Sequence, residues 1–219
     1  MAHLDLEEQE QLDQFKQFWK QYGNLITWAL LLVVVLFAGW TGWQYWQNRQ
    51  AGEASAFYEE VERIAMAGDA ARMDRALSDM KERFSGTVQA QRAGLLVAAV
   101  HAAAGRSDAA RTALQAVAEQ GADEGLRAIA RLRLAGLLLD AKSYDDALKA
   151  LSADFPPAFV ALAADRRGDI YLAQGKKPEA TEQYRQAAKG LDATNNYRTV
   201  VDGKLAALGA AIEPAGAAK

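Results

Sequence analysis

The sequence predicts an all-α protein in which a single N-terminal transmembrane helix precedes an irregular α-solenoid domain. Three observations indicate this fold class. Residues 21–48 form a run of 28 residues without Asp, Glu, Lys, Arg or His. The rest of the chain is rich in Ala, Leu, Arg, Glu and Gln, which favour helices. Small and large residues recur there at similar spacings, as they do in proteins built from stacked helical pairs.

Residues 1–22 are predicted to form a short acidic cytoplasmic tail. Residues 1–48 hold five acidic and two basic residues, whereas the remaining 171 residues hold 23 of each. Leu12, Phe15 and Trp19 recur at helical spacing, which predicts an amphipathic helix leading into the membrane segment. We expect this helix to settle at the membrane interface, and a docking motif for a cytoplasmic partner is the alternative.

Residues 23–46 are predicted to be a transmembrane signal anchor. The 19 residues from Leu25 to Trp43 are nearly all apolar, and a helix of that length spans roughly 30 Å, the thickness of the bilayer core. A buried core helix is one alternative, and a signal peptide cleaved near residues 54–56 is another. The long apolar run and the acidic leader argue against cleavage. Aromatic residues at both ends predict contacts with the membrane interface: Trp19, Tyr22, Trp43, Tyr45 and Trp46.

The flanking charges indicate the orientation only weakly. Lys16 and Lys20 precede the run closely, whereas Arg49 and Arg63 follow it at slightly greater distances. The positive-inside rule therefore favours a cytoplasmic N-terminus, and a short tail before a long domain fits the same orientation. We expect a single-pass type II protein with its C-terminal domain outside the cytoplasm. The chain has no cysteine, which suits either side of a bacterial inner membrane.

Residues 47–212 are predicted to form the helical repeat domain, and residues 213–219 a disordered C-terminus. Glycine-containing turns separate segments of 12–20 residues, among them a first helical pair near 53–68 and 71–84. A helix near 197–212 is expected to close the array, because terminal helices commonly cover the last repeat.

The clearest repeat begins at Ala161. Gly168, Tyr171, Ala180, Tyr184 and Ala187 occupy positions 8, 11, 20, 24 and 27 of this unit. This spacing resembles the 34-residue tetratricopeptide repeat (TPR), in which small residues let two antiparallel helices approach. Two weaker copies precede it, and their members at the same positions are Ala98, His101, Ala110 and Leu114, then Ala135, Leu138, Ala147 and Leu151.

Three stretches together resemble one family over essentially the whole chain. They are the tail end Phe15–Gly23, the aromatic exit Trp43-Gln-Tyr-Trp46, and the stretch Ala164-Asp-Arg-Arg-Gly-Asp169. The chain resembles the YfgM-type ancillary subunits of the bacterial Sec translocon. The resemblance implies an inner-membrane protein with a periplasmic TPR-like domain, whose partners are translocon subunits and a membrane-anchored periplasmic chaperone of the prolyl-isomerase class. It also implies help in handing emerging polypeptides to periplasmic chaperones.

The residues predict no enzyme, cofactor or metal site. His3 lies in the tail, and His101 occupies a packing position of the first repeat, where we expect it to be buried or half-buried. The domain has no cysteine and no second histidine, so it has few of the side chains that form nucleophile–base pairs and transition-metal sites. The neutral domain also argues against nucleic acid as a partner. Membrane lipid and other proteins remain, and no small-molecule substrate is expected.

Protein binding is expected on the surface lined by the first helix of each pair. The repeat register selects a largely apolar candidate groove: Arg92, Leu95, Ala99, Ile129, Leu132, Leu139, Asp165, Asp169 and Leu172. Two alternatives remain open at this point. Residues 197–212 fill the groove intramolecularly, or the two aspartates belong to an ordinary ion-pair cluster on a helix surface.

Three functions are compatible with an anchored repeat domain. The first is a membrane-anchored adaptor of the secretion machinery that acts through protein–protein contacts. The second is a scaffold subunit of another envelope complex, such as the division or outer-membrane assembly machinery. The third is a regulator that acts through its cytoplasmic tail.

Overall fold

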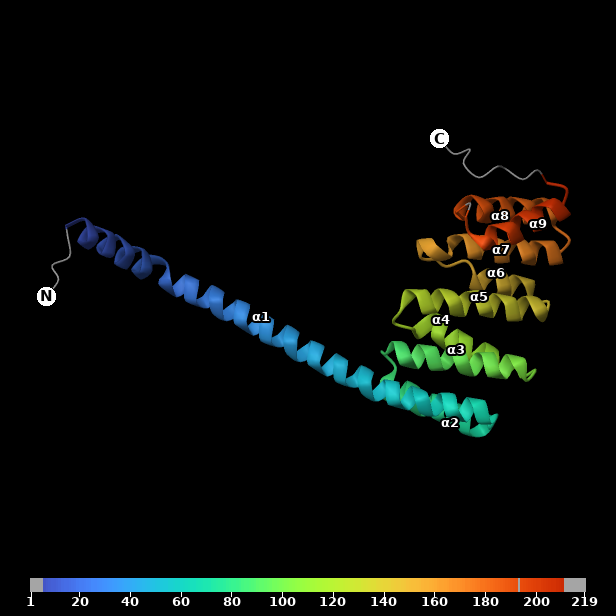
Figure 1. Cartoon of the computed structure of the whole chain (residues 1–219), viewed down its shortest axis with the longest axis horizontal. Helices are drawn as coiled ribbons and strands as arrows, with labels where there is room; N and C mark the ends of the chain where they lie inside the picture. The colour runs from blue at the N-terminus through green and yellow to red at the C-terminus, as the bar shows by residue number, and fades with distance from the viewer. Residues whose placement is uncertain (1–5, 193, 211–219) are drawn as a thin grey trace. The chain divides into compact units, whose positions relative to one another are not determined.

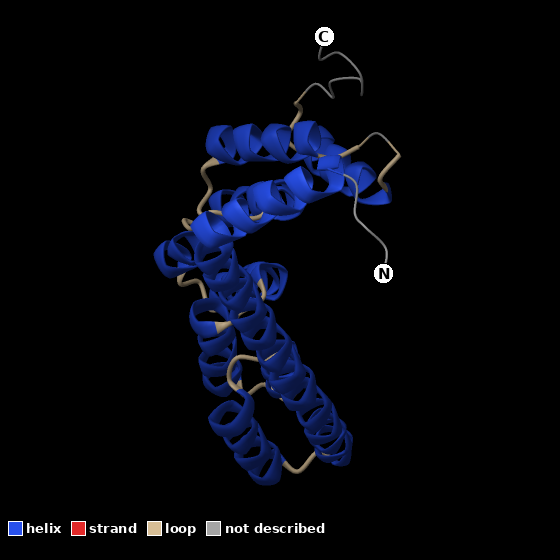
Figure 2. Cartoon of the chain, turned by 90° about the vertical axis from the view of Figure 1, so that its left-hand side faces the viewer, coloured by secondary structure: helices blue, strands red, loops and turns tan. Residues whose placement is uncertain are grey.

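The computed structural model describes residues 6–192 and 194–210, with side-chain surroundings from residue 15 onward. Within these residues the secondary structure consists of helices joined by turns, with no strand (Figure 2). The predicted all-α fold is therefore confirmed. The chain divides into two units, residues 1–50 and 51–219, and each is described by itself. The predicted disordered segment 213–219 lies outside the described residues.

The helices follow one another along the chain with short connections (Figure 1). Their bounds are α1 Leu6–Ala67, α2 Ala70–Phe84, α3 Val88–Ala103, α4 Ser107–Gln120, α5 Glu124–Asp140, α6 Tyr144–Ala150, α7 Pro157–Ala173, α8 Lys177–Gly190 and α9 Asn196–Ala207.

The first unit consists of α1 up to residue 50, and it contains a helix long and apolar enough to cross a membrane. Its most apolar window has a mean hydropathy of 2.1, and none of that window is buried. The hydroxyl groups of Thr27 and Thr41 donate hydrogen bonds to the carbonyl oxygens of Gly23 and Phe37. These bonds satisfy the polar groups within the helix, as a bilayer requires. The five predicted interface aromatics are all exposed.

The second unit is a stack of helical pairs. Residues 51–67 of α1 share one core with α2, as the buried Val61, Met73 and Met80 show. The pairs α3–α4, α5–α6 and α7–α8 follow, and α9 packs against α8. Two apolar clusters run through this unit, one from α1 to α7 and a smaller one formed by α7, α8 and α9.

The repeat positions expected from the sequence coincide with the packing of the pairs. The alanines at position 20 (Ala110, Ala147 and Ala180) are completely buried, and their small side chains allow the two helices of each pair to approach closely. The residues at position 24 are large and buried as well: Leu114, Leu151 and Tyr184. Small residues at the crossing and large ones beside it explain why these segments pair.

The same turn ends the first helix of each of the three repeats. Gly105, Lys142 and Gly175 have φ values of 72°, 58° and 76°. The backbone N–H of the next residue donates back to the carbonyl of the residue four before the turn, as in Ser143 to Leu138. A left-handed residue in this place ends a helix and satisfies its last carbonyl groups. Lys142 adopts this conformation without being glycine, which costs about 1 kcal/mol.

Candidate functional site

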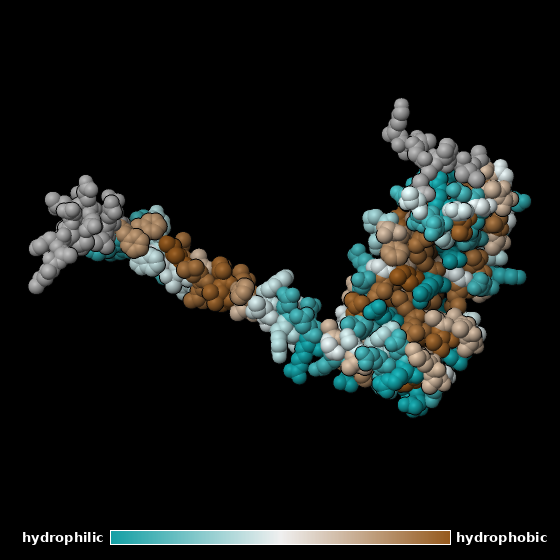
Figure 3. Space-filling model, in the orientation of Figure 1, coloured by the Kyte–Doolittle hydropathy of each residue, from teal (hydrophilic) through white to brown (hydrophobic). Residues whose placement is uncertain are grey.

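The candidate site is the face formed by the first helices α3, α5 and α7. Figure 3 shows apolar side chains gathered over these helices in the middle of the repeat domain. Leu96, Ile129 and Leu132 are half-buried and pack against the underlying core. They present apolar surface at the face without being fully covered.

The structure separates the predicted groove residues into three environments. Arg92, Ala99 and Leu172 are exposed. Ile129, Leu132, Leu139 and Asp169 are partly buried, and the three apolar members of this group pack against the core. Leu95 and Asp165 are 7 % and 2 % exposed, respectively. Leu95 therefore belongs to the core beneath the face, and Asp165 has its partners inside the protein.

Asp165 and Asp169 anchor α9 to α7. The ammonium group of Lys204 on α9 donates to both carboxylate oxygens of Asp165 at 2.8 and 2.9 Å, and to Asp169 at 2.6 Å. Tyr197 donates its phenol hydrogen to Asp165 at 2.6 Å, and Tyr184 does so to Asp169 at 2.9 Å. The terminal helix therefore occupies the α7 end of the candidate groove. The alternative of an ordinary surface ion pair does not describe Asp165, which is buried.

Three arginines cross the seams between successive first helices. Arg92 of α3 lies over the ring of Tyr58 in α1, with its Cζ 6.0 Å from the centroid. Arg133 of α5 donates from Nη1 to the carbonyl of Leu95 in α3 at 3.4 Å. Arg166 of α7 lies against α5, because a Cβ built on Gly136 would be 3.8 Å from its Cζ. We call Arg92, Arg133 and Arg166 the arginine ladder.

The repeat register predicts Arg92 as a groove residue but not Arg133 or Arg166. A signal for the other two was present, since they lie 33 residues apart, the same separation as Ala147 and Ala180 at position 20. Both arginines therefore occupy position 6 of their repeats. Their common direction across the seam depends on the packing of the first helices, which the spacing does not show.

Comparisons with known proteins agree with this architecture. The family model of the tetratricopeptide repeat-like domain matches residues 16–210. A protein from Neisseria gonorrhoeae named ancillary SecYEG translocon subunit is 33 % identical over 208 residues, which cover 94 % of this chain and 99 % of the relative. The chain belongs to this family of TPR-like ancillary SecYEG translocon subunits.

Two further members of the family extend the comparison. Proteins of the same name from Haemophilus influenzae and Escherichia coli are 31 % and 26 % identical, and each alignment covers 83 % of this chain. No solved structure matches the chain. The resemblance drawn from the aromatic exit and the repeat motif is thereby confirmed. A translocon-subunit name and an adaptor fold suggest a non-enzymatic role, and the candidate span fits a membrane protein.

In this ancillary-subunit fold, His101 is a buried link between two helical pairs. It is 2 % exposed, in agreement with the predicted packing role. Arg106 donates from Nε to its Nδ1 at 2.8 Å, so that Nδ1 is the acceptor. The proton therefore lies on Nε2, which is 2.6 Å from a carboxylate oxygen of Asp74 in α2. Both ring nitrogens are thus used for structure.

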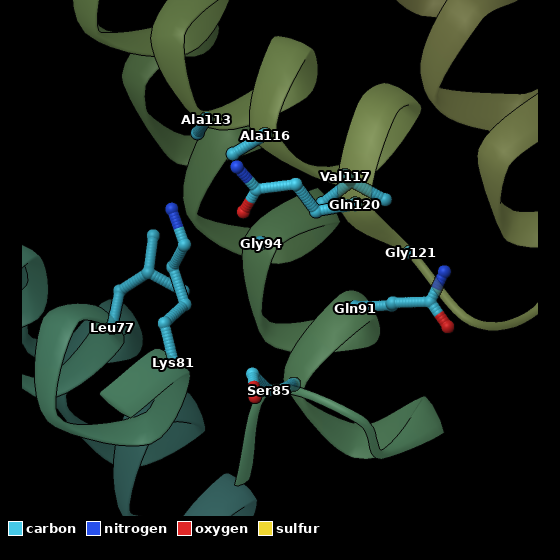
Figure 4. Close-up of a pocket in the computed structure, with 11 residues that line it drawn as sticks. Leu77, Lys81, Ser85, Gln91, Gly94, Ala113, Ala116, Val117, Gln120 and Gly121 are labelled. Atoms are coloured by element: carbon cyan, nitrogen blue, oxygen red, sulfur yellow. The ribbon is translucent and has the colours of Figure 1, made fainter. Parts of the chain in front are cut away.

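A small pocket lies between α2, α3 and α4 (Figure 4). Leu77 and Val117 supply apolar walls, and Lys81 lies at its edge. The amide of Gln91 forms two hydrogen bonds with the backbone of Asp123, at 2.9 and 3.3 Å, and holds the start of α5 in place. The cavity measures about 80 Å³, whereas cofactor pockets usually exceed about 300 Å³. Within the described residues, no group of three or more metal-binding side chains occurs.

The tyrosines at the α7–α9 contact predict a loss of stability at alkaline pH. Burial, and then the carboxylate of Asp169, raises the pKa of Tyr184 above its usual 10.0. Burial and the hydrogen bond to Asp165 raise the pKa of Tyr197 in the same way. Above pH 10 the unfolded chain loses these protons while the folded chain keeps them. We therefore expect the free energy of unfolding to fall by up to about 1.4 kcal/mol per pH unit for each tyrosine.

Urea unfolding at pH values between 9 and 11.5 measures this effect. The variant with both Tyr184→Phe and Tyr197→Phe is expected to lose stability less steeply than the parent protein over the same pH range. Equal slopes for the two proteins would contradict the assignment of this alkaline sensitivity to the α7–α9 contact.

Proposed function

We propose that this protein is a single-pass inner-membrane subunit that associates with the SecYEG translocon and helps to transfer emerging polypeptides to periplasmic chaperones. The main support is the 33 % identity to an ancillary SecYEG translocon subunit, which extends over 94 % of the chain and so includes the candidate span as well as the repeats. In this proposal residues 1–22 are the cytoplasmic tail, residues 23–46 cross the membrane, and residues 47–212 form a periplasmic adaptor domain.

The physical properties of the two units support this division of roles. A translocon partner lies in the same bilayer as the span, and exposed Trp43, Tyr45 and Trp46 border the apolar run on its domain side. The repeat domain supplies a partly apolar face of first helices, the kind of surface with which solenoid proteins bind partners. A membrane-anchored chaperone of the prolyl-isomerase class is the further partner in this proposal.

Site-specific photo-crosslinking in intact cells tests the proposal. A photoreactive residue is placed at Tyr45, which is 72 % exposed, and at Arg92 on the repeat face. Translocon subunits are the expected products from Tyr45, and the periplasmic chaperone or translocating chains are expected from Arg92. Arg75, which is exposed on α2 away from the first-helix face, is the matched control.

Experiments in the same cells also test the orientation of the protein in the membrane and the alternative functions. Alkaline phosphatase fused after Lys219 should be active, because this enzyme needs the oxidising periplasm. A well-expressed but inactive fusion would contradict the proposed topology. Recovery of division or outer-membrane assembly proteins in place of translocon subunits would replace the adaptor with a scaffold of another envelope complex.

A further inference from the structure

We propose that the first-helix face binds a partner segment in which acidic side chains alternate with apolar ones, and that the arginine ladder pairs with its carboxylates. The inference rests on the proposed function in one respect, because it takes protein–protein contact to be the role of the repeat domain. It goes further by stating the chemistry of the bound segment.

Basic side chains connect each first helix to the one before it. Arg92 reaches from α3 to α1, Arg133 from α5 to α3, and Arg166 from α7 to α5. Lys204 continues the series, reaching from α9 to α7. Four successive first-helix seams are thus each crossed by a cation. The cations are held in a row along one face by the stacking of the repeats.

The cations of the row differ in whether they have a carboxylate partner inside the protein. Lys204 is held by Asp165 and Asp169. Within the part of the chain that the structure describes, neither Arg92 nor Arg133 forms an ion pair. Arg166 pairs through Nη1 with Oδ2 of Asp169 at 3.5 Å, whereas Lys204 and Tyr184 donate to Oδ1 of the same carboxylate. Arg92 and Arg133 therefore keep their capacity for an external carboxylate, and Arg166 keeps the guanidinium N–H groups that do not face Asp169.

The first and second helices of the pairs differ in their charge. The first helices α3, α5 and α7 carry six arginines and four carboxylates, a net charge of +2. The second helices α2, α4, α6 and α8 carry nine basic and nine acidic residues and are neutral. Residues 51–67 of α1, the first helix of the first pair, carry four glutamates and one arginine, so the positive charge of the face lies on α3, α5 and α7 and not on α1.

Half-buried apolar side chains accompany the arginines on this face. Leu96 follows Arg92 by one helical turn and Ile129 precedes Arg133 by one turn, and both are half-buried. Burial of this surface under apolar side chains of a partner contributes favourably to the free energy of binding. The planar guanidinium groups bind carboxylates through paired hydrogen bonds. A purely apolar segment would leave the arginines unused, and a purely acidic segment would leave the apolar side chains uncovered. A segment with both properties satisfies the whole face.

Peptide binding to the full-length protein in nanodiscs tests the inference. The probe is a fluorescein-labelled synthetic peptide of alternating leucine and glutamate, and the matched probe has glutamine in place of glutamate. Fluorescence anisotropy should show tighter binding of the glutamate peptide. Arg92→Gln, Arg133→Gln and Arg166→Gln should each weaken it about two- to fivefold, and the triple variant about 10- to 100-fold. Arg72→Gln and Arg75→Gln on α2 are the controls and should change nothing.

Three results would overturn the inference: no binding of the glutamate peptide, equal binding of the glutamine peptide, or an unchanged affinity of the triple variant. Circular dichroism verifies that the variants keep the parent helix content and melting temperature. Normal translocon crosslinks without discrimination between the peptides would refute this inference and leave the proposed function standing. Clear discrimination between the two peptides without translocon crosslinks would support this inference and contradict the proposed function.

Discussion

Replacing Lys204 with methionine is expected to destabilise the C-terminal end of the repeat domain by about 2–4 kcal/mol, because the substitution leaves a buried carboxylate without its counter-charge. Asp165 is 2 % exposed, whereas the Lys204 side chain is 26 % exposed. Methionine preserves most of the aliphatic part of the lysine side chain, so the loss of stability results from removal of the charge. Urea unfolding of the full-length protein in detergent measures it, and hydrogen exchange should show faster opening of α9.

Two further variants isolate the cause of this loss. Adding Asp165→Asn to Lys204→Met should restore part of the stability, because the buried group is then neutral. Lys149→Met, at an exposed position on α6, is the matched control and should change the free energy of unfolding by no more than about 0.5 kcal/mol. Equal effects of Lys204→Met and Lys149→Met would show that the α7–α9 ion pairs contribute nothing.

Truncation of Tyr184 to alanine is expected to cost about 3–5 kcal/mol, since it empties a large space in a well-packed interior. Tyr184 is the largest fully buried side chain of the described residues. Its ring lies against Gly168, where an added Cβ would be 2.5 Å from a ring carbon. Tyr184→Phe should cost less, about 1.5–3 kcal/mol, the range for a hydrogen bond to a charged group such as the carboxylate of Asp169. Thermal and urea unfolding compare the three proteins.

Gly168→Ala provides the complementary test of this contact. In the parent protein the new methyl group overpacks the α7–α8 crossing and should cost about 1–3 kcal/mol. In the Tyr184→Ala background the same substitution enters an empty space and should cost less. Additive losses in the double variant would contradict direct contact between the two positions.

The helical pairs could be predicted because their signals are local. The glycines at the turns and the alanines at position 20 lie within one repeat, and the span is a continuous apolar run. His101 could be placed for the same reason, since its repeat position is a packing position. Each of these features lies within one helix or one helical pair, where helix periodicity and turn conformation act.

The candidate site could be predicted only in part. The register selected Arg92 and placed Ile129 and Leu132 near the face, but it also selected the buried Leu95 and Asp165. Asp165 is adjacent to Arg166 in the sequence, which favoured an ion pair on one helix surface. Its actual partners, Tyr197 and Lys204, follow 32 and 39 residues later on a different helix. Their approach depends on how α9 packs against α8, which periodicity does not specify.

The sequence by itself determined the uncharged run, the helical character of the chain, the boundaries of the repeats and the family to which the chain belongs. These properties follow from composition and from spacing along one chain. Only the tertiary structure decided that α9 closes the α7 end of the face, that Asp165 is neutralised from α9, and that three arginines form a row across the helix seams. The physical reason is that burial and ion pairing depend on distances between helices, which are set by packing and not by residue order.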